Sequence, residues 1–204
     1  DPGVEYFTTI MIGIAIQAIA AYGLNIIVGY AGQISLGHAA FYGIGAYASA
    51  ILTTKAGFTF WEALPCVVLI SGFSGFLLGL PSLRVREDFL AITTIGINFI
   101  VEAVFLYTAF FGAALGIGGI PRVVVMGQRL GNSQFLWLCL ILLALCILIC
   151  RRFSRTWAGL SCFAVRENET AASSMGISPV KAKLSAFTLG TAMAGLAGAL
   201  YAHY

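Results

Sequence analysis

The chain has 204 residues, of which 60% are hydrophobic and only 9% are charged, and its mean hydropathy is +0.96. Soluble domains carry about 25% charged residues, so this composition excludes a water-facing globular protein and indicates an integral membrane protein. The formal net charge of +3 gives no reason to expect nucleic-acid binding.

Long runs without charged residues predict membrane-spanning helices. Residues 6–54 contain no Asp, Glu, Lys or Arg. That run is long enough for two spans, because a helix needs about 20 apolar residues to cross a hydrocarbon core of about 30 Å. We therefore expect an all-α, polytopic membrane protein in which residues 1–204 form a single transmembrane domain. About six spans are expected, at residues 6–28, 35–54, 61–80, 89–111, 134–150 and 179–204.

Basic residues between the expected spans predict the orientation. Eight of them fall on one side of the membrane: Arg84, Arg86, Arg151, Arg152, Arg155, Arg166, Lys181 and Lys183. The other side has three, namely Lys55, Arg122 and Arg129. Because cytoplasmic loops are enriched in Lys and Arg, we expect the first group to be cytoplasmic and both ends of the chain to lie outside.

Residues 24–47 join the first two expected spans without forming a hydrophilic turn. Five glycines loosen this stretch, and it carries five polar side chains at or near membrane depth: Asn25, Gln33, Ser35, His38 and Tyr42. Non-helical backbone at that depth is tolerated only inside protein or beside a water-filled cavity. We favour a broken segment that lines a substrate path, with a tight interhelical turn as the alternative, and we expect Ser35 to cap the second span.

Three polar residues of the fourth expected span, Thr94, Asn98 and Glu102, are spaced four apart and share one face of a helix. A charged residue at mid-membrane costs about 2.5–3.5 kcal/mol on insertion scales, so it usually faces a partner or water. Either this stripe lines a substrate path, or Glu102 lies near a helix end and bonds a neighbour. Both interpretations stay open.

Residues 151–183 form an extended hydrophilic region between the last two expected spans. Within it, residues 167–175 predict a short helix with acidic residues near its start and a stop at Gly176, where we expect a positive φ. Ser178 and Pro179 then predict the N-cap and first position of the last span. The segment from about 158 to 178 is suited to transmit force from a soluble partner, and a generic loop is the alternative.

Small residues and cysteines are assigned to packing. Gly75 and Gly79 in the third span, and Ala194 and Gly198 in the last, have a spacing that predicts close helix contacts. The five cysteines are expected to be free thiols that behave as small apolar residues: Cys66, Cys139, Cys146, Cys150 and Cys162. No metal site and no cofactor are expected, because His38 and His203 each stand alone in the sequence.

Residues 29–41, Gly-Tyr-Ala-Gly-Gln-Ile-Ser-Leu-Gly-His-Ala-Ala-Phe, and residues 43–47, Gly-Ile-Gly-Ala-Tyr, closely resemble the signature of branched-chain amino acid permeases of the LivM type. Residues 166–177 resemble that family's cytoplasmic EAA loop, and residues 194–204 resemble the helix that follows it. The resemblance covers nearly the whole chain. Because relatives are longer and the chain stops at the end of a span, we expect a fragment of a longer permease.

The resemblance implies a transport subunit and not an enzyme. Such a permease forms the translocation path for branched-chain, hydrophobic amino acids in the inner (plasma) membrane of a prokaryote. The implied partners are a second permease subunit, two ATP-binding-cassette ATPase subunits, an extracytoplasmic substrate-binding protein and membrane lipid. The residues implied to couple to the ATPase are Arg166, Glu167, Glu169, Ala171, Ala172, Gly176 and Ile177.

The sequence contains no Gly-x-x-x-x-Gly-Lys-Ser/Thr motif, so ATP hydrolysis is expected on a partner chain. Three alternative functions are weighed. A permease of a related urea or short-chain amide importer is the main alternative on substrate. An ATP-independent secondary transporter would use Glu102 and His38 as titrating groups. A membrane-bound enzyme would need a nucleophile or a metal cluster, and the sequence shows no such set of residues.

Overall fold

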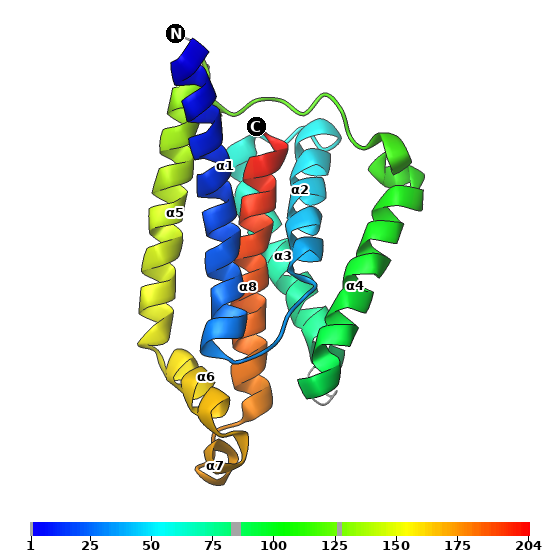
Figure 1. Ribbon diagram of the computed structural model, residues 1–204. Coiled ribbons are helices and arrows are strands. Elements are labelled where there is room, and N and C mark those ends of the chain that lie inside the picture. The colour runs from blue at the N-terminus through cyan, green and yellow to red at the C-terminus, as the bar shows by residue number, and fades with distance from the viewer. Residues whose placement is uncertain (1, 83–86, 126–127) are drawn as a thin grey trace.

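The computed structural model describes residues 2–82, 87–125 and 128–204. The long helices of these residues stand side by side in one bundle (Figure 1). They are α1 (Pro2–Asn25), α2 (His38–Thr54), α3 (Phe60–Ser82), α4 (Glu87–Tyr107), α5 (Asn132–Ser154) and α8 (Pro179–Ala202). The all-α, polytopic architecture expected from the sequence is confirmed.

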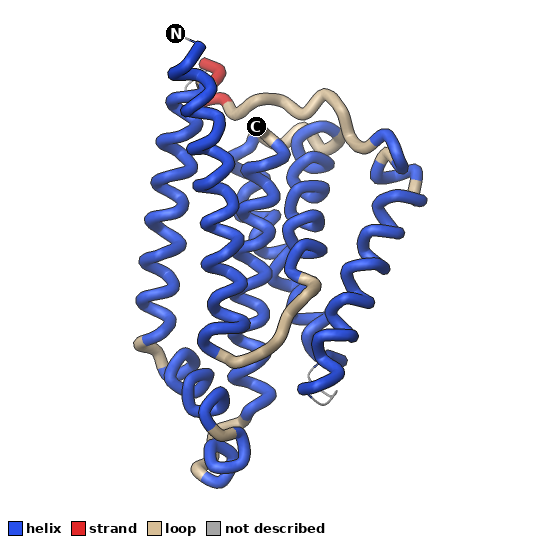
Figure 2. The backbone as a smooth tube through the Cα atoms, viewed as in Figure 1, coloured by secondary structure: helices blue, strands red, loops and turns tan. Residues whose placement is uncertain are grey.

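Shorter elements lie at the two ends of the bundle (Figure 2). At the lower end, α6 (Trp157–Glu167) and α7 (Glu169–Ser174) connect α5 to α8. At the upper end are two 3-10 turns, η2 (Ala109–Phe111) and η3 (Ala113–Leu115). An antiparallel pair of two-residue strands, β1 (Val124–Val125) and β2 (Gln128–Arg129), follows there, with Val124 opposite Arg129.

Four helical segments of the described residues are long and apolar enough to cross a membrane: Gly3–Tyr30, Phe60–Leu80, Asn132–Ser154 and Pro179–Ala202. The other two members of the bundle are shorter. α2 has 17 residues, and the apolar part of α4 is Ala91–Tyr107. Each of the six expected spans falls on a bundle helix, but the crossing of all six stays a prediction.

α8 is the centre of the bundle, where it packs against α1, α2 and α3. Small residues make this possible. A side chain at Gly75 of α3 would collide with Thr191 of α8, and a Cβ at Gly79 would lie 3.1 Å from Phe187. Two small residues of α8, Gly198 and Ala194, also lie at helix contacts.

A side chain at Gly198 would collide with the backbone of Tyr42 in α2, and Ala194 is fully buried in a cluster with Ile27 and Phe41. All four small residues of the predicted spacing therefore lie at helix contacts, which confirms that prediction. The five cysteines are free thiols, and four of them are buried.

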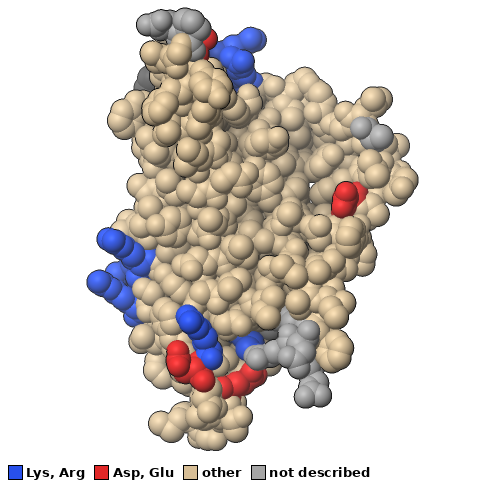
Figure 3. Space-filling view, in the orientation of Figure 1, with Lys and Arg blue, Asp and Glu red and all other residues tan. Residues whose placement is uncertain are grey.

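Charged side chains gather toward the two ends of the bundle, and the face between them is largely uncharged (Figure 3). Six of the eight basic residues assigned to the cytoplasmic side lie on α5, α6 and α8 or between them, at the end that carries α7. Arg84 and Arg86 lie outside the described residues. The basic residues therefore gather at one end of the bundle, which agrees with the charge bias from which the orientation was predicted. The orientation itself stays a prediction.

Candidate functional site

The chain between α1 and α2 is broken, as the sequence led us to favour. α1 passes into a π-helical turn, η1 (Ile26–Tyr30), and residues 31–37 are non-helical before α2 begins at His38 (Figure 2). Gly32 has φ +69, a conformation that glycine adopts at little cost. Its amide, together with that of Gln33, closes the π-helical turn by bonding the carbonyls of Val28 and Ile27.

The expectation that Ser35 caps the second span is wrong. α2 begins three residues later, and its N-cap is Gly37, so the hydroxyl of Ser35 is too early in the chain to reach the free amides of the first turn. Ser35 and Gln33 are instead buried, with exposed fractions of 7% and 3%. Neither side chain has a hydrogen-bond partner among the described residues. Buried polar groups of this kind are normally satisfied by water, a ligand or another chain.

A first cavity, of about 380 Å³, lies between α1 and α2 and is lined by Gln17, Leu24, His38 and Tyr42. The Nε2 atom of His38 lies 3.0 Å from the carbonyl oxygen of Ala20. Because a carbonyl only accepts, Nε2 carries the proton and donates it, which leaves Nδ1 as an acceptor. Within the described part of the chain, Nδ1 and the Tyr42 hydroxyl have no partner. The Tyr42 ring lies 5.7 Å from that of Tyr201 on α8.

A second cavity, of about 480 Å³, lies between α2 and α4. Asn98 and Glu102 of α4 line it together with mainly apolar and small residues, including Ala40, Gly43, Val101, Phe105 and Leu106. A carboxylate and an amide beside an apolar wall can hold a small molecule that has a polar head and an apolar tail. Both cavities share one lining residue, Ala39, on the first turn of α2.

The predicted α4 stripe divides in the structure. Asn98 and Glu102 face the second cavity, whereas Thr94 is buried and holds the broken segment in place. Its hydroxyl accepts a bond from the amide of Leu36 at 3.1 Å and donates to the carbonyl of Ala91 at 2.9 Å. Of the eight residues predicted for a substrate path, four line a cavity.

The other four, Asn25, Gln33, Ser35 and Thr94, line neither of these two cavities. Sequence reasoning missed Gln17, Ala39 and Tyr47, which do line them. Gln17 is a polar residue in an apolar helix and was a usable signal. Ala39 carries no signal, because its role depends on which helices flank α2.

The hydrophilic segment before α8 contains two helices. The short helix expected over residues 167–175 is present as α7 (Glu169–Ser174), with Glu169 in its first turn, but it begins two residues later than expected. Glu167 is the last residue of α6, and Asn168 has an extended backbone between the two helices. The Asn168 side chain accepts a bond from the amide of Ala171 at 2.9 Å and caps α7. α6 was missed, although Thr156 caps it through the amide of Gly159 at 3.3 Å.

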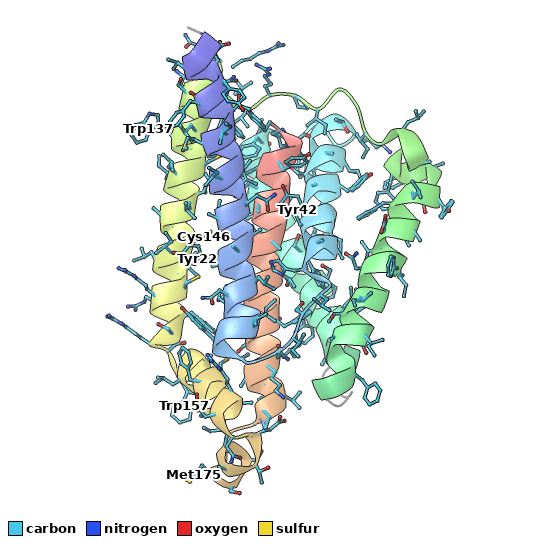
Figure 4. All side chains as sticks on the ribbon, viewed as in Figure 1. Tyr22, Tyr42, Trp137, Cys146, Trp157 and Met175 are labelled. Carbon is cyan, nitrogen blue, oxygen red and sulfur yellow. The ribbon has the colours of Figure 1, made fainter. Side chains whose placement is uncertain are left out.

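The end of this segment is as expected in two respects. Gly176 has φ +83, and Pro179 lies in the first turn of α8. Ser178 is the N-cap residue of α8, but its side chain makes no capping bond. Trp157 and Met175 lie on the exposed lower end of the molecule, with exposed fractions of 78% and 84% (Figure 4).

The residues predicted for ATPase coupling differ in their surroundings. Ala172 is buried and Ile177 is half-buried, while Ala171 and Glu167 are exposed. Glu169 forms an ion pair with Lys183 of α8, with 2.7 Å between Oε2 and Nζ. Arg166 donates from Nη1 to the carbonyl oxygen of Gly29 in η1. Some residues of this set therefore bond or pack within the chain, and others are exposed.

No group of three or more His, Cys, Asp or Glu side chains in the described ranges is arranged to hold a metal ion. α2 lies between the two cavities, and the broken segment leads into its first turn.

Residues 6–204 match the family described as branched-chain amino acid transport system / permease component. The chain belongs to this family. The permease family match is supported by individual relatives. The chain is 38% identical to the high-affinity branched-chain amino acid transport system permease protein LivM of Salmonella typhimurium, and 37% identical to the protein of that name in Escherichia coli. Each alignment covers 92% of this chain and 50% of the relative.

A probable branched-chain amino acid transport permease protein LivM of Methanocaldococcus jannaschii is 28% identical over 67% of this chain and 41% of its own length. The chain thus spans about half the length of the curated permeases that it matches. No solved structure matches it.

Proposed function

We propose that this protein is the membrane-spanning permease subunit of an ATP-binding-cassette importer for branched-chain amino acids. The observation that carries the proposal is the permease-component match over residues 6–204. That stretch includes the broken segment, both cavities and the segment expected to couple to an ATPase. The relatives in Salmonella typhimurium and Escherichia coli are named as high-affinity branched-chain amino acid permeases.

The cavity between α2 and α4 is consistent with such a substrate. Its volume of about 480 Å³ is within the range of small-molecule sites, about 300–1,000 Å³. We propose that the Glu102 carboxylate attracts the ammonium group of the amino acid and that Asn98 bonds its carboxylate. The apolar wall, which includes Val101 and Phe105, then receives the aliphatic side chain. Urea lacks such an apolar group and has less to gain from this wall.

The importer is proposed to contain a second permease subunit, two ATPase subunits and an extracytoplasmic substrate-binding protein in a prokaryotic inner membrane. α6 and α7 are the elements proposed to face the ATPase, since they project below the bundle (Figure 1). The basic residues at that end support its placement in the cytoplasm.

The test is uptake by the natural, full-length permease, co-expressed with the ATPases and binding protein encoded beside it. We expect ATP-dependent uptake of radiolabelled leucine, isoleucine and valine, and no uptake when the ATPase cannot hydrolyse ATP. Transport of urea or acetamide in preference to leucine would assign the protein to the related amide importers. Uptake without an ATPase would assign it to secondary transporters and would contradict the proposal.

A further inference from the structure

The segment proposed to couple to the ATPase contacts the broken segment directly, through Arg166 near the end of α6. Its guanidinium donates from Nη1 to the carbonyl oxygen of Gly29, although the two residues are 137 positions apart in the chain. The aliphatic part of the same side chain covers Gly32. A Cβ at Gly32 would lie 2.9 Å from Cγ of Arg166, in a backbone that already has φ +69. The Arg166 side chain therefore packs closely against Gly32.

A second contact joins the same two elements. The ring of Phe163, one turn earlier on α6, lies 4.9 Å from the ring of Tyr30 in η1. Phe163 and Arg166 are three residues apart and so lie on one face of α6. That face packs against a π-helical turn. Such irregularities in helices are frequent at functional sites. α6 and η1 are thus joined by a polar contact and an aromatic contact.

The contacts continue from η1 to the cavity between α2 and α4. Residues 31–37 follow η1 directly, and the amide of Leu36 is held by the hydroxyl of Thr94 on α4. Gly37 lies against the Thr94 backbone so closely that a side chain there would collide with it. One and two turns further along α4 are Asn98 and Glu102, which line the cavity. A continuous series of contacts therefore connects α6 to the wall of the cavity.

We propose that Arg166 is a positioning residue of the transport cycle. In this inference, which rests on the proposed function, Arg166 acts on the permease itself by tying α6 to η1. It does not act as a docking contact for the ATPase. A displacement of α6 by the ATPase then moves residues 31–37 and, through Thr94, the α4 wall of the cavity. Gln33 and Ser35, buried and without partners among the described residues, lie in the segment that moves.

The experiment uses the complete importer in proteoliposomes and compares Arg166→Ala with Arg166→Lys. Three quantities are measured: ATPase subunits retained on purification, ATP hydrolysis stimulated by the loaded binding protein, and substrate imported per ATP. For Arg166→Ala we expect retained ATPase subunits and continued hydrolysis, with substrate imported per ATP reduced by about tenfold or more, within the usual range of coupling between sites. Arg166→Lys keeps a donor and should recover part of the loss.

Arg155→Ala is the matched control, because Arg155 is an exposed arginine at the same end, and no side-chain bond is found for it among the described residues. It should import as much per ATP as the unaltered protein. Loss of the ATPase subunits from the Arg166→Ala importer would show a docking residue and overturn the inference. Unchanged import per ATP would overturn it as well.

Thr94→Val tests the far end of the path, since valine keeps the shape and removes the hydroxyl that holds Leu36. If Arg166 and Thr94 act in one path, the double variant should be no worse than the more severe single variant. Multiplied losses would show independent effects and contradict the path. An unaltered importer without ATP-dependent uptake would instead overturn the proposed function, so the two failures are distinguishable.

Discussion

His203, the residue directly after α8, is hydrogen-bonded to Ser49 of α2, with 2.9 Å between Nε2 and Oγ. Its other nitrogen, Nδ1, lies 2.8 Å from the carbonyl oxygen of Pro121. Because that carbonyl only accepts, Nδ1 carries the proton and Nε2 accepts from the serine hydroxyl. His203 therefore joins α8, α2 and the connection that follows α4. Its ring also meets that of Phe60 edge to face, at 4.9 Å.

Replacing His203 with alanine should destabilise the upper end of the bundle. The Ser49 hydroxyl is fully buried, and a buried polar group left unsatisfied costs about 1–3 kcal/mol. We expect a lower midpoint of thermal unfolding in detergent and faster proteolysis between α4 and α5. Tyr201→Phe, at an exposed neighbour on α8, is the control and should unfold like the unaltered protein. Equal midpoints for His203→Ala would contradict a structural role for this histidine.

Gly45 of α2 should not tolerate a side chain, whereas Gly13 of α1 should. A Cβ at Gly45 would collide with the backbone of Gly195 in α8, while a Cβ at Gly13 meets nothing within 4 Å. Backbone cannot move aside as a side-chain tip can, and overpacking costs about 1–3 kcal/mol. Membrane abundance and detergent stability should fall for Gly45→Ala and stay unchanged for Gly13→Ala. Equal stability of the two variants would show that α2 and α8 do not pack this closely.

Ala39→Leu should block transport without preventing assembly. Ala39 is the one residue that lines both cavities beside α2, so the larger side chain occupies the space on either side. We expect uptake to fall about tenfold or more, since pockets discriminate by tenfold or more for a single methylene group. Ala39→Ser keeps the size and should retain uptake. Normal uptake by Ala39→Leu at normal abundance would exclude both cavities from the path.

Gly176→Val should abolish substrate-stimulated ATP hydrolysis and uptake while the permease stays in the membrane. A Cβ at Gly176 meets nothing within 4 Å, so the expected effect comes from the backbone, whose φ of +83 costs L-residues about 1–2 kcal/mol. Asparagine tolerates positive φ, so Gly176→Asn should retain most activity. Normal uptake by Gly176→Val would mean that residues 158–178 are only a connector.

Labelling should place α7 in the cytoplasm. Ser173 of α7 and Asn132 at the start of α5 are both exposed and lie at opposite ends of the bundle. A membrane-impermeant maleimide added to intact cells should label Asn132→Cys and leave Ser173→Cys unlabelled until the cells are opened. Rapid labelling of Ser173→Cys in intact cells would show that the orientation is the opposite of the predicted one.

Cys162 of α6 should add little to this labelling, because burial raises the pKa of its thiol and the thiolate is the reactive form. Its background reaction should therefore increase as the pH is raised. The unaltered protein provides the measurement of that background.

Local sequence determined the features that depend on local physics. Apolar runs such as residues 134–150 predict helices, because a chain in lipid must satisfy its own backbone hydrogen bonds. The positive φ of Gly176 followed from a glycine after a short helical pattern. The small residues at Gly75 and Gly198 indicated close helix contacts, although not with which helix.

The tertiary structure alone decided which residues meet. Arg166 was chosen from a resemblance, and nothing in its neighbours indicates that its partner is the carbonyl of Gly29. Thr94 and Glu102 share one helix face. In the folded protein Thr94 bonds the amide of Leu36, whereas Glu102 lines a cavity, and this difference depends on how the chain around α2 packs against α4. The pairing of His203 with Ser49 spans 154 positions of the chain. Such contacts depend on the packing of whole helices around α8, which no local pattern encodes.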